Sequence, residues 1–369
     1  MSNFSYEDNK NIIKQNDINN IKYLSTEEEF NLKLEQSANN NNNFNKSIIL
    51  KLNKKIFNYK ILSICLISII LILLIILSII LYNHIDENNN NTIDIIQKEK
   101  NSNSSIFDLV YNDIIFNNYI SGDFFSQLSD NKTIFYAQTD YLDNQTWRIT
   151  QNYTVLITHN SDGKIDYSDY NKFLQCGKFK YWFAQNPNIN EPRLFTLPIG
   201  LMNKEWHKYP RFNLMMEEKK KNIKPTKLLL LSFSIINNED KRQQCVNSFI
   251  NKTYVTNNIV DKVKNFIGDV KKYDRKFFNI MLDHLFVACP EGNGIDTHRF
   301  WETLYMGRYP VVLHNRVNDA FSDLPVLILN KWEDFEREYL IFLERIKKKQ
   351  FSYKKLTQEY WIDRINNLE

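Results

Sequence analysis

This sequence has few cysteines, no long basic tract and no internal repeat. Its four cysteines form no Cys-x-x-Cys pair, and we predict no zinc or other metal site from them. The formal net charge is only +4, and no basic tract is long enough to indicate binding to nucleic acid. An aromatic content of 14% and a hydrophobic content of 43% are enough for a sizeable core. The sequence therefore predicts a folded protein that does not bind nucleic acid.

Charge and proline are also absent from one long segment, Ile61–Tyr82, which is apolar apart from its serines. At about 1.5 Å per residue, a helix of this length spans a hydrocarbon core of about 30 Å. The segment is too long and begins too far into the chain for a cleaved signal peptide. A buried helix of a soluble domain is the alternative, but so long a segment without a charge argues against it.

The residues on either side of this segment predict its orientation. Acidic residues follow it at Asp86 and Glu87, and basic residues precede it at Lys51, Lys54, Lys55 and Lys60. The positive-inside rule then places the N-terminus in the cytosol and residues 83–369 in the lumen or outside the cell. We predict a transmembrane anchor over 61–82.

Composition divides the rest of the chain. Residues 1–60 are polar and Asn-rich, which predicts a disordered cytosolic tail, and the Asn- and Ser-rich residues 83–105 predict a flexible stem. Apolar residues are spread through the remainder, which we divide near Asn222–Pro225 into α/β domains over 106–225 and 226–369. On the luminal side at most one disulfide can form, among Cys176, Cys245 and Cys289. Glycosylation sequons on that side begin at Asn90, Asn103, Asn131, Asn144, Asn152 and Asn251.

The most informative stretch combines strand, loop, helix and strand. The apolar run Leu285–Ala288 predicts a buried strand, and a loop with Gly292 and Gly294 follows it. An amphipathic helix is expected from about Ile295 to Met306, and another strand begins at Val311–Leu313. In such a βαβ unit, phosphate-bearing ligands bind at the loop, because the helix dipole and free N–H groups favour an anion.

Polar residues at the start of the helix fit such a ligand. His298, Arg299 and Glu302 are spaced three and four apart, so they share one side of the helix. An arginine near a diphosphate and a glutamate near ribose hydroxyls are what binding of a sugar nucleotide requires. The alternative is a solvated helix face with an Arg299–Glu302 pair.

The whole run Gly-Asn-Gly-Ile-Asp-Thr-His-Arg-Phe-Trp-Glu-x-Leu-x-x-Gly-x-x-Pro-Val-Val, from Gly292 to Val312, resembles the C-terminal half of exostosin-type glycosyltransferases. The resemblance, to glycosyltransferase family 47 and its short relatives, implies a GT-B fold of two Rossmann-like domains. It also implies a Leloir transferase that moves a sugar from a nucleotide sugar, with a UDP-sugar as first choice, to a glycan or glycoprotein acceptor. Together with the single anchor it implies a type II Golgi membrane protein that needs no cofactor.

The first half of the chain is similar to the same family. Three short strands are predicted at Val155–Thr158, Lys180–Ala184 and Leu194–Leu197, and each ends in a polar loop. The loops read Thr-His-Asn-Ser-Asp, Trp-Phe-Ala-Gln-Asn-Pro and Leu-Pro-Ile-Gly-Leu-Met-Asn-Lys-Glu-Trp. An α/β domain has its site along such an edge. Residues 332–369 are helical by pattern, and in GT-B enzymes the last helix returns to the first domain.

Mechanism follows from the requirements of a GT-B enzyme. The chain contains no Asp-x-Asp, the carboxylate pair that holds a divalent ion in the other main glycosyltransferase fold. We therefore expect metal-free stabilisation of the leaving group by Arg299, Arg242 and the Asn293-Gly294 backbone. Glu302 is expected to bind the ribose, and His298 or Asp296 to line the diphosphate.

Two strand-end residues are candidates for the general base that accepts the acceptor's proton. Asp162 is the first choice and His159 the second, because both are expected to face the cleft. The alternative for this His-Asn-Ser-Asp run is a turn cap, since Asn, Ser and Asp all favour turns.

Two other classes of protein share some of these features. A non-catalytic protein that binds glycans or nucleotide sugars on the same fold would have lost the diphosphate site, but Gly292, Gly294, Arg299 and Glu302 are all present. A luminal sulfotransferase has the same topology but needs a Gly-x-x-Lys-[Ser/Thr] phosphate loop. The region after residue 106 contains none.

Overall fold

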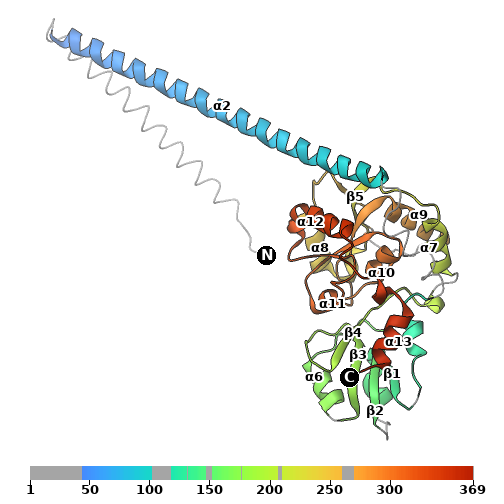
Figure 1. Cartoon of the computed structure of the whole chain (residues 1–369). Helices are drawn as coiled ribbons and strands as arrows, with labels where there is room; N and C mark the ends of the chain where they lie inside the picture. Colours follow the sequence, from blue (N-terminus) through green and yellow to red (C-terminus); the bar gives the residue numbers. More distant parts are fainter. Residues whose placement is uncertain are drawn as a thin grey trace. The chain divides into compact units, whose positions relative to one another are not determined.

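A computed structural model of the chain divides it into two compact units, Met1–Asn88 and Asn89–Glu369 (Figure 1). The described residues are 44–101, 118–130, 132–146, 152–175, 177–206, 210–259 and 270–368. The second unit is mixed α/β with two fully parallel sheets.

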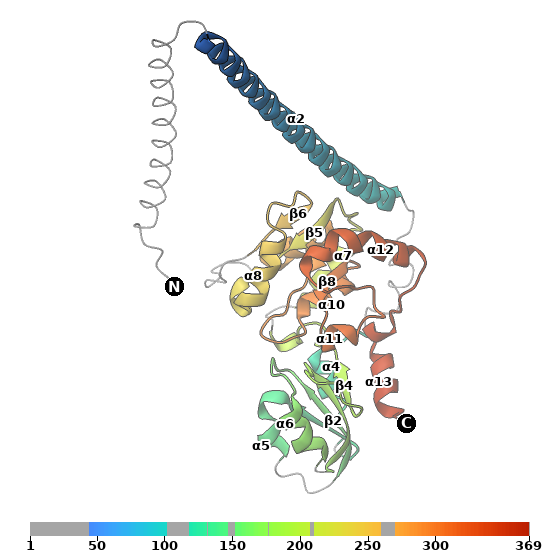
Figure 2. The same cartoon turned by 90° about the vertical axis from the view of Figure 1, so that its left-hand side faces the viewer.

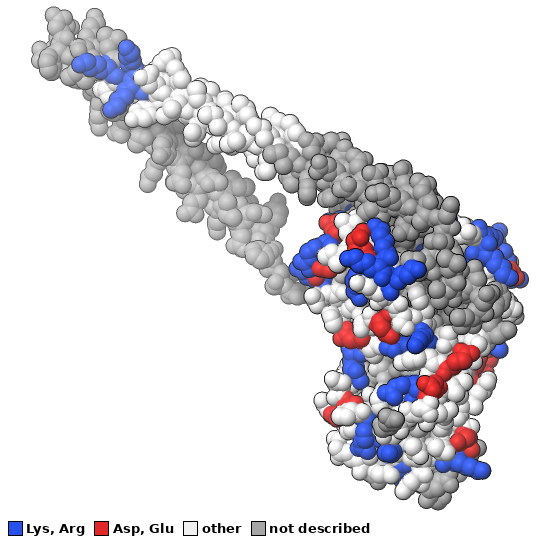
Figure 3. All heavy atoms as spheres, in the orientation of Figure 1, with Lys and Arg blue, Asp and Glu red and all other residues white. Residues whose placement is uncertain are grey.

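Helix α2, Phe44–Asn101, contains the segment expected to lie in a membrane. Within the described residues, its stretch Lys51–Ile79 is the one long and apolar enough to cross a bilayer, and none of it is buried. Figure 3 shows basic side chains at the start of this stretch and an uncharged surface after them. The length and composition of α2 thus suit a membrane span that overlaps the predicted 61–82.

The same helix also differs from the sequence prediction at both ends of the apolar segment. Residues 44–60 and 83–101 are helical, where a disordered tail and a flexible stem were expected. The physical reason is the absence of glycine and proline between residues 44 and 101, so nothing interrupts the helix. Residues 1–43 and 102–105 lie outside the described residues.

The first sheet contains four parallel strands in chain order. They are β1 (Ile134–Gln138), β2 (Tyr153–His159), β3 (Phe179–Gln185) and β4 (Leu194–Leu197). The short helices around them are α4 (Gly122–Ser126), η1 (Thr139–Tyr141), α5 (Leu142–Thr146), α6 (Tyr167–Tyr170), η2 (Asn171–Gln175) and η3 (Lys204–Trp206). Three of the strands match predicted ones. The strand that the sequence analysis missed, β1, lies at a sheet edge and is only partly buried, so its apolar pattern is weak.

The second sheet contains five parallel strands in the order β6-β5-β7-β8-β9. They are β5 (Lys227–Leu231), β6 (Val255–Asn257), β7 (His284–Ala288), β8 (Tyr309–Leu313) and β9 (Leu327–Leu329). The chain adds β6 on one side of β5 and then returns to its other side at β7. This reversal creates a switch point at the carboxyl ends of β5 and β7, the place where open parallel sheets bind ligands.

Helices connect and cover this sheet (Figure 2). They are α7 (Arg211–Lys219), η4 (Ile235–Asn237), α8 (Glu239–Ser248), α9 (Val270–Leu282), α10 (His298–Tyr305), α11 (Arg316–Asp319), η5 (Trp332–Asp334), α12 (Phe335–Lys347), η6 (Lys354–Leu356) and α13 (Gln358–Asn366). The predicted helix 295–306 is α10. It begins later than expected because Asp296 and Thr297 still belong to the preceding loop.

The two sheets are joined by elements that cross between them. The last helix, α13, contacts the first half, as the sequence analysis expected. Gln358 Nε2 donates to Tyr119 O at 2.8 Å, and Arg364 lies over the ring of Phe195 at 4.7 Å. Helix α7 precedes the second sheet but packs on its helix α9, where Arg275 Nη1 donates to Glu218 Oε1 at 2.7 Å. One core cluster accordingly includes buried side chains from both sheets.

Candidate functional site

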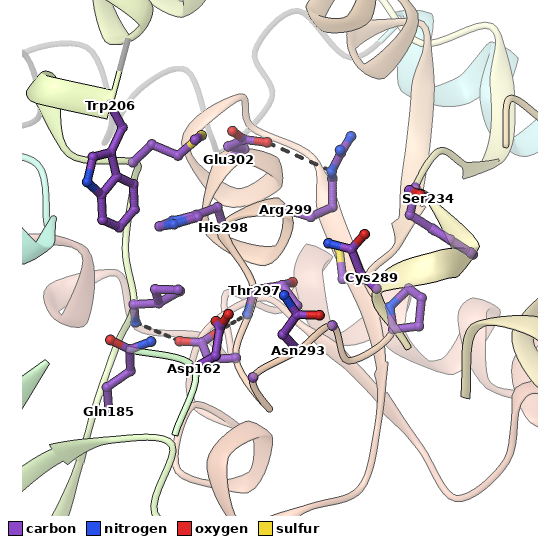
Figure 4. Close-up of a pocket in the computed structure, with 18 of the residues that line it drawn as sticks. Asp162, Gln185, Trp206, Ser234, Cys289, Asn293, Thr297, His298, Arg299 and Glu302 are labelled. Carbon is purple, nitrogen blue, oxygen red and sulfur yellow. Dashed lines mark hydrogen bonds and ion pairs between the residues drawn. The ribbon is translucent and has the colours of Figure 1, made fainter. Parts of the chain in front are cut away.

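A cleft of about 810 Å³ lies where the carboxyl ends of strands from both sheets face each other. From the first sheet it takes residues at the carboxyl ends of β2 and β3, such as Asp162 and Gln185. From the second sheet it takes Ser234, after β5, and the loop after β7 (Figure 4). That loop, residues 289–297, is called the glycine loop below. The cleft therefore occupies the switch point of the second sheet. The sequence predicted a site for a phosphate-bearing ligand at this loop.

Helix α10 has an apolar side and a polar side, and the polar side contributes side chains to this cleft. Phe300, Trp301 and Leu304 are fully buried in the core. His298, Arg299 and Glu302 lie on the other side and line the cleft, as the helical spacing predicted. The helix is thus fixed by its apolar side while its first turn faces the cavity.

Arg299 has donors that the protein leaves unused. Its Nε and Nη1 atoms are buried and donate no hydrogen bond within the described residues. The guanidinium stacks on the ring of Phe277 at 3.9 Å, and its Nε lies 3.8 Å from Glu302 Oε2, too far for a hydrogen bond. Burial lowers the pKa of Arg299, and the charge of Glu302 opposes that effect. A buried cation with free donors is a site for an anion.

Two hydroxyl groups on the same side of the cleft are also unpartnered. Ser234 Oγ and Thr297 Oγ1 are buried without a hydrogen-bond partner in the described part of the chain. Thr297 is the N-cap residue of α10, yet its side chain does not cap the helix. The first N–H groups of α10 are therefore left to bind a ligand together with these hydroxyls.

Glu302 is held by an arginine that the sequence analysis missed. Arg211, from α7, donates through Nη1 to Glu302 Oε1 and through Nε to Asp274 Oδ2 at 2.8 Å. Burial alone would raise the pKa of Glu302, but the charges of Arg211 and Arg299 hold it below its usual value. Glu302 is therefore an ionised carboxylate at the wall of the cleft.

Arg242 ties the glycine loop to the residues after β5 by hydrogen bonds. It donates through Nε to Glu291 O at 2.9 Å and through Nη1 to Ser234 O at 2.5 Å. Burial lowers the pKa of Arg242 to about 10, which leaves it charged at neutral pH. A Cβ atom at Gly292 would lie only 2.8 Å from Arg242 Nη2, so glycine is what allows this contact. Asn293, the exposed residue of the loop, also lines the cleft.

Gly294 and Asp296 bring the glycine loop against the first sheet. A Cβ atom at Gly294 would lie 2.7 Å from Asn186 Nδ2 and 3.4 Å from Asp162 Oδ1. Asp296 N donates to Asn186 Oδ1 at 2.9 Å, and Asp296 Oδ2 accepts from Ile199 N at 2.7 Å. Trp301 Nε1 donates to the same oxygen at 2.8 Å. Burial raises the pKa of Asp296 to about 7. Asp296 thus joins the two walls of the cleft. The first wall is formed by residues of the first sheet and its loops, and the second wall by Ser234, the glycine loop and α10.

His298 makes a similar connection but keeps one nitrogen free. Its Nδ1 donates to Gly200 O at 2.8 Å, and its ring meets Trp206 edge-on at 5.8 Å. Burial lowers the pKa of His298, which favours the neutral ring. Nε2 is then an acceptor without a partner among the described residues, on a side chain that lines the cleft.

The two candidate bases, Asp162 and His159, have different surroundings. Asp162 is exposed and faces the cleft, as expected. His159 does not line it. This fully buried ring donates from Nε2 to Pro198 O at 2.9 Å and accepts at Nδ1 from Asn160 N at 2.8 Å. Burial lowers its pKa to about 4. His159 therefore holds the strand end in place and has no nitrogen left to accept a proton from a substrate.

Other residues complete the comparison with the sequence predictions. Cys245 and Cys289 are buried free thiols, and Cys176 lies outside the described residues. No group of three or more potential metal ligands is found in the described ranges, and metal independence stays a prediction. The cleft residues that the sequence analysis did not propose include Arg211, Ser234, Thr297 and Trp206. Ser234 lies three residues after the end of the apolar strand β5, so the strand-end argument used for the first half could have found it.

Comparison with known proteins does not identify the function of this chain. No family model matches the chain. No curated protein matches it either. It is similar to the solved structure of a glycosyltransferase from Rickettsia africae ESF-5, with 12% identity and a TM-score of 0.30, over 64% of this chain and 73% of that chain. The evidence for a function therefore lies in the site itself.

Proposed function

We propose that this chain is a glycosyltransferase of the exostosin type that uses a nucleoside diphosphate sugar as donor. The observation that carries the proposal is the set of unused buried atoms on one wall of the cleft: Arg299 Nε and Nη1, Ser234 Oγ and Thr297 Oγ1. Buried polar atoms in native proteins almost always have partners, so atoms that lack them at a cleft point to a ligand. A guanidinium and two hydroxyls beside a helix N-terminus suit a diphosphate.

The rest of the cleft suits the other parts of such a donor. The ionised Glu302 can accept hydrogen bonds from ribose hydroxyls, in accordance with the role that the sequence resemblance implies for it. The volume of about 810 Å³ lies within the range of pockets that bind ligands of this size. We take a UDP-sugar as the first candidate donor.

In the proposed reaction, the bond between the anomeric carbon and the diphosphate oxygen breaks, and the electron pair leaves with the diphosphate. Arg299, the Ser234 and Thr297 hydroxyls and the first N–H groups of α10 stabilise the charge that develops there. The acceptor oxygen bonds to the anomeric carbon, and its proton passes to Asp162. Asp162 suits this role because it is exposed on the opposite wall, close to the glycine loop.

We also propose a membrane topology and a cellular location for this chain. The apolar stretch of α2 and the lysines before it support a type II anchor, with the α/β unit in the Golgi lumen and a glycan or glycoprotein as acceptor. In this arrangement residues 106–225 serve the acceptor and residues 226–369 the donor, as the two domains of a GT-B enzyme do.

Calorimetric titration of the full chain in detergent with UDP, GDP, CMP and the adenosine-based sulfate donor tests the proposal. We expect one nucleoside diphosphate to bind and Arg299→Ala to weaken it roughly 10- to 100-fold, because a hydrogen bond to a charged group is lost. Arg337→Ala is the matched control, since Arg337 is exposed and neither it nor its partners Asp334 and Glu338 line the cleft. Binding of the sulfate donor alone would indicate a sulfotransferase. Binding of a nucleoside diphosphate without transfer would indicate the non-catalytic alternative.

A further inference from the structure

Glu302 has one oxygen engaged by the protein and one that is not. Oε1 accepts from Arg211 Nη1. Oε2 lies 3.8 Å from Arg299 Nε and accepts no hydrogen bond from the described residues, although Glu302 lines the cleft. A carboxylate held in this way presents a single free acceptor in a fixed direction.

The arginine that engages Oε1 is itself rigidly placed. Arg211 pairs with Asp274 through Nε and with Glu302 through Nη1, and its guanidinium lies over the ring of Phe278 at 4.7 Å. The three side chains are nearly buried, with exposed fractions of 13% for Arg211, 9% for Asp274 and 3% for Glu302. A planar guanidinium between two carboxylates cannot rotate without breaking one of the pairs.

The origin of Arg211 is unexpected. It begins α7, before the first strand of the second sheet, whereas Asp274 belongs to α9 and Glu302 to α10. The pair with Glu302 joins residues that are 91 positions apart. The position of Glu302 in the proposed donor site thus depends on α7. This helix lies outside the βαβ unit that contains the motif Gly292–Val312.

We infer that Arg211 is a positioning residue that fixes Glu302 so that its free oxygen selects ribose over deoxyribose in the donor nucleotide. This inference rests on the proposed function. Arg211 itself need not touch the ligand. It directs Oε2 towards the cleft and prevents Glu302 from turning to pair fully with Arg299, whose donors are then left for the diphosphate.

The test uses the full chain in detergent and measures Kd for UDP and GDP and for their 2′-deoxy and 3′-deoxy forms. In the wild type we expect the ribonucleotide to bind roughly tenfold or more tightly than one of its deoxy forms, because a hydrogen bond to a charged group is lost. Arg211→Met should reduce this preference to about twofold or less, while Arg211→Lys, which keeps the charge but not the fork, should keep part of it. Arg275→Met is the matched control on α9, and it should retain the full preference.

The outcomes separate the inference from the proposed function. If the wild type binds no nucleoside diphosphate, the proposed function fails and the inference with it. If the wild type binds but shows no ribose preference, or if Arg211→Met binds ribo- and deoxyribonucleotides more weakly by the same factor, the inference alone is overturned. Asp274→Asn, which loosens Arg211 without removing it, covers the case in which Arg211→Met does not fold. It should lower the preference partially, and an unchanged preference would contradict the inference.

Discussion

The two walls of the cleft differ in how they satisfy their own polar groups. On the first wall, the groups at the carboxyl ends of β1, β2 and β3 bond to one another. Gln185 Nε2 donates to Ser161 O at 2.8 Å, and Ser161 Oγ donates to Asp140 Oδ1 at 2.5 Å. On the second wall, Ser234 and Thr297 have buried hydroxyls without partners.

Under the proposed function, this difference suits the two walls to different roles. A self-bonded wall is complete without a ligand and keeps its shape, whereas unpartnered buried groups destabilise the empty protein until a ligand satisfies them. We therefore expect the second wall to provide most of the affinity for the donor. The first wall should provide a rigid frame and one exposed carboxylate, Asp162.

The largest expected effect is on the chemistry at that carboxylate. Asp162→Asn should lower the rate of sugar transfer by roughly 10²- to 10⁴-fold, the usual contribution of a general base. Nucleotide affinity should stay within about threefold, because the second wall is unchanged. Rates of sugar release from the donor in the presence of acceptor would measure the first quantity, and calorimetry the second.

Asp143→Asn is the matched control for this substitution. It removes another exposed carboxylate of the first half, one that pairs with Lys172 at the surface. If Asp162→Asn retained more than about a tenth of the wild-type rate, Asp162 would not be the base. In that case the free Nε2 of His298 would be the next group to test.

A smaller effect should appear in the pH dependence of folding, through His159, the buried last residue of β2. Its pKa is lowered to about 4 by burial, from 6.5 when exposed, so the unfolded chain binds a proton that the folded chain does not. The stability that this group contributes is present above about pH 6.5 and is lost as the pH falls towards 4. The loss is at most about 3 kcal/mol.

The variant His159→Gln isolates that contribution. Asp296, with its pKa raised to about 7, acts in the opposite direction, because its deprotonation costs stability as the pH rises from about 4 to 7. The quantity to measure is therefore the difference in unfolding free energy between wild type and variant at pH 7.5 and pH 4.5. A difference that does not change with pH would show that His159 is not a buried neutral ring. The polar groups at the end of β2 would then not all be satisfied within the protein.

The sequence predicted the buried strands better than the partly exposed ones. Strands such as β7 are fully buried and give long apolar runs, whereas the edge strands β1 and β6 are partly exposed and leave weak patterns. Local spacing also placed Arg299 and Glu302 on one side of α10 correctly, since that depends only on the helical period.

What local patterns could not predict are the contacts between distant segments. The pairing of Arg211 with Glu302 and the burial of His159 depend on how α7 and the loop after β4 pack, and no spacing in the sequence encodes that. His159 and Asp162 look equivalent in the sequence as polar residues after one strand. The structure separates them because the last residue of β2 still points into the core, whereas the loop residue does not.

The smallest expected effects test the comparison of the two walls most directly. Ser234→Ala and Thr297→Val should weaken binding of the nucleoside diphosphate roughly 3- to 10-fold, because each removes one hydrogen bond to the ligand. They should not lower the melting temperature of the empty protein, since these hydroxyls have no protein partner to lose. Differential scanning fluorimetry and calorimetry on the same samples measure both quantities.

Ser161→Ala is the matched substitution on the first wall, and it should behave in the opposite way. It removes the hydrogen bond to Asp140 and the one that Gly163 N donates to Ser161 Oγ at 2.9 Å. The unfolding free energy should fall by about 1 kcal/mol, with nucleotide affinity unchanged. If all three variants lost stability and affinity together, the two walls would not be distinct, and the unpartnered hydroxyls would belong to the folded core and not to a ligand site.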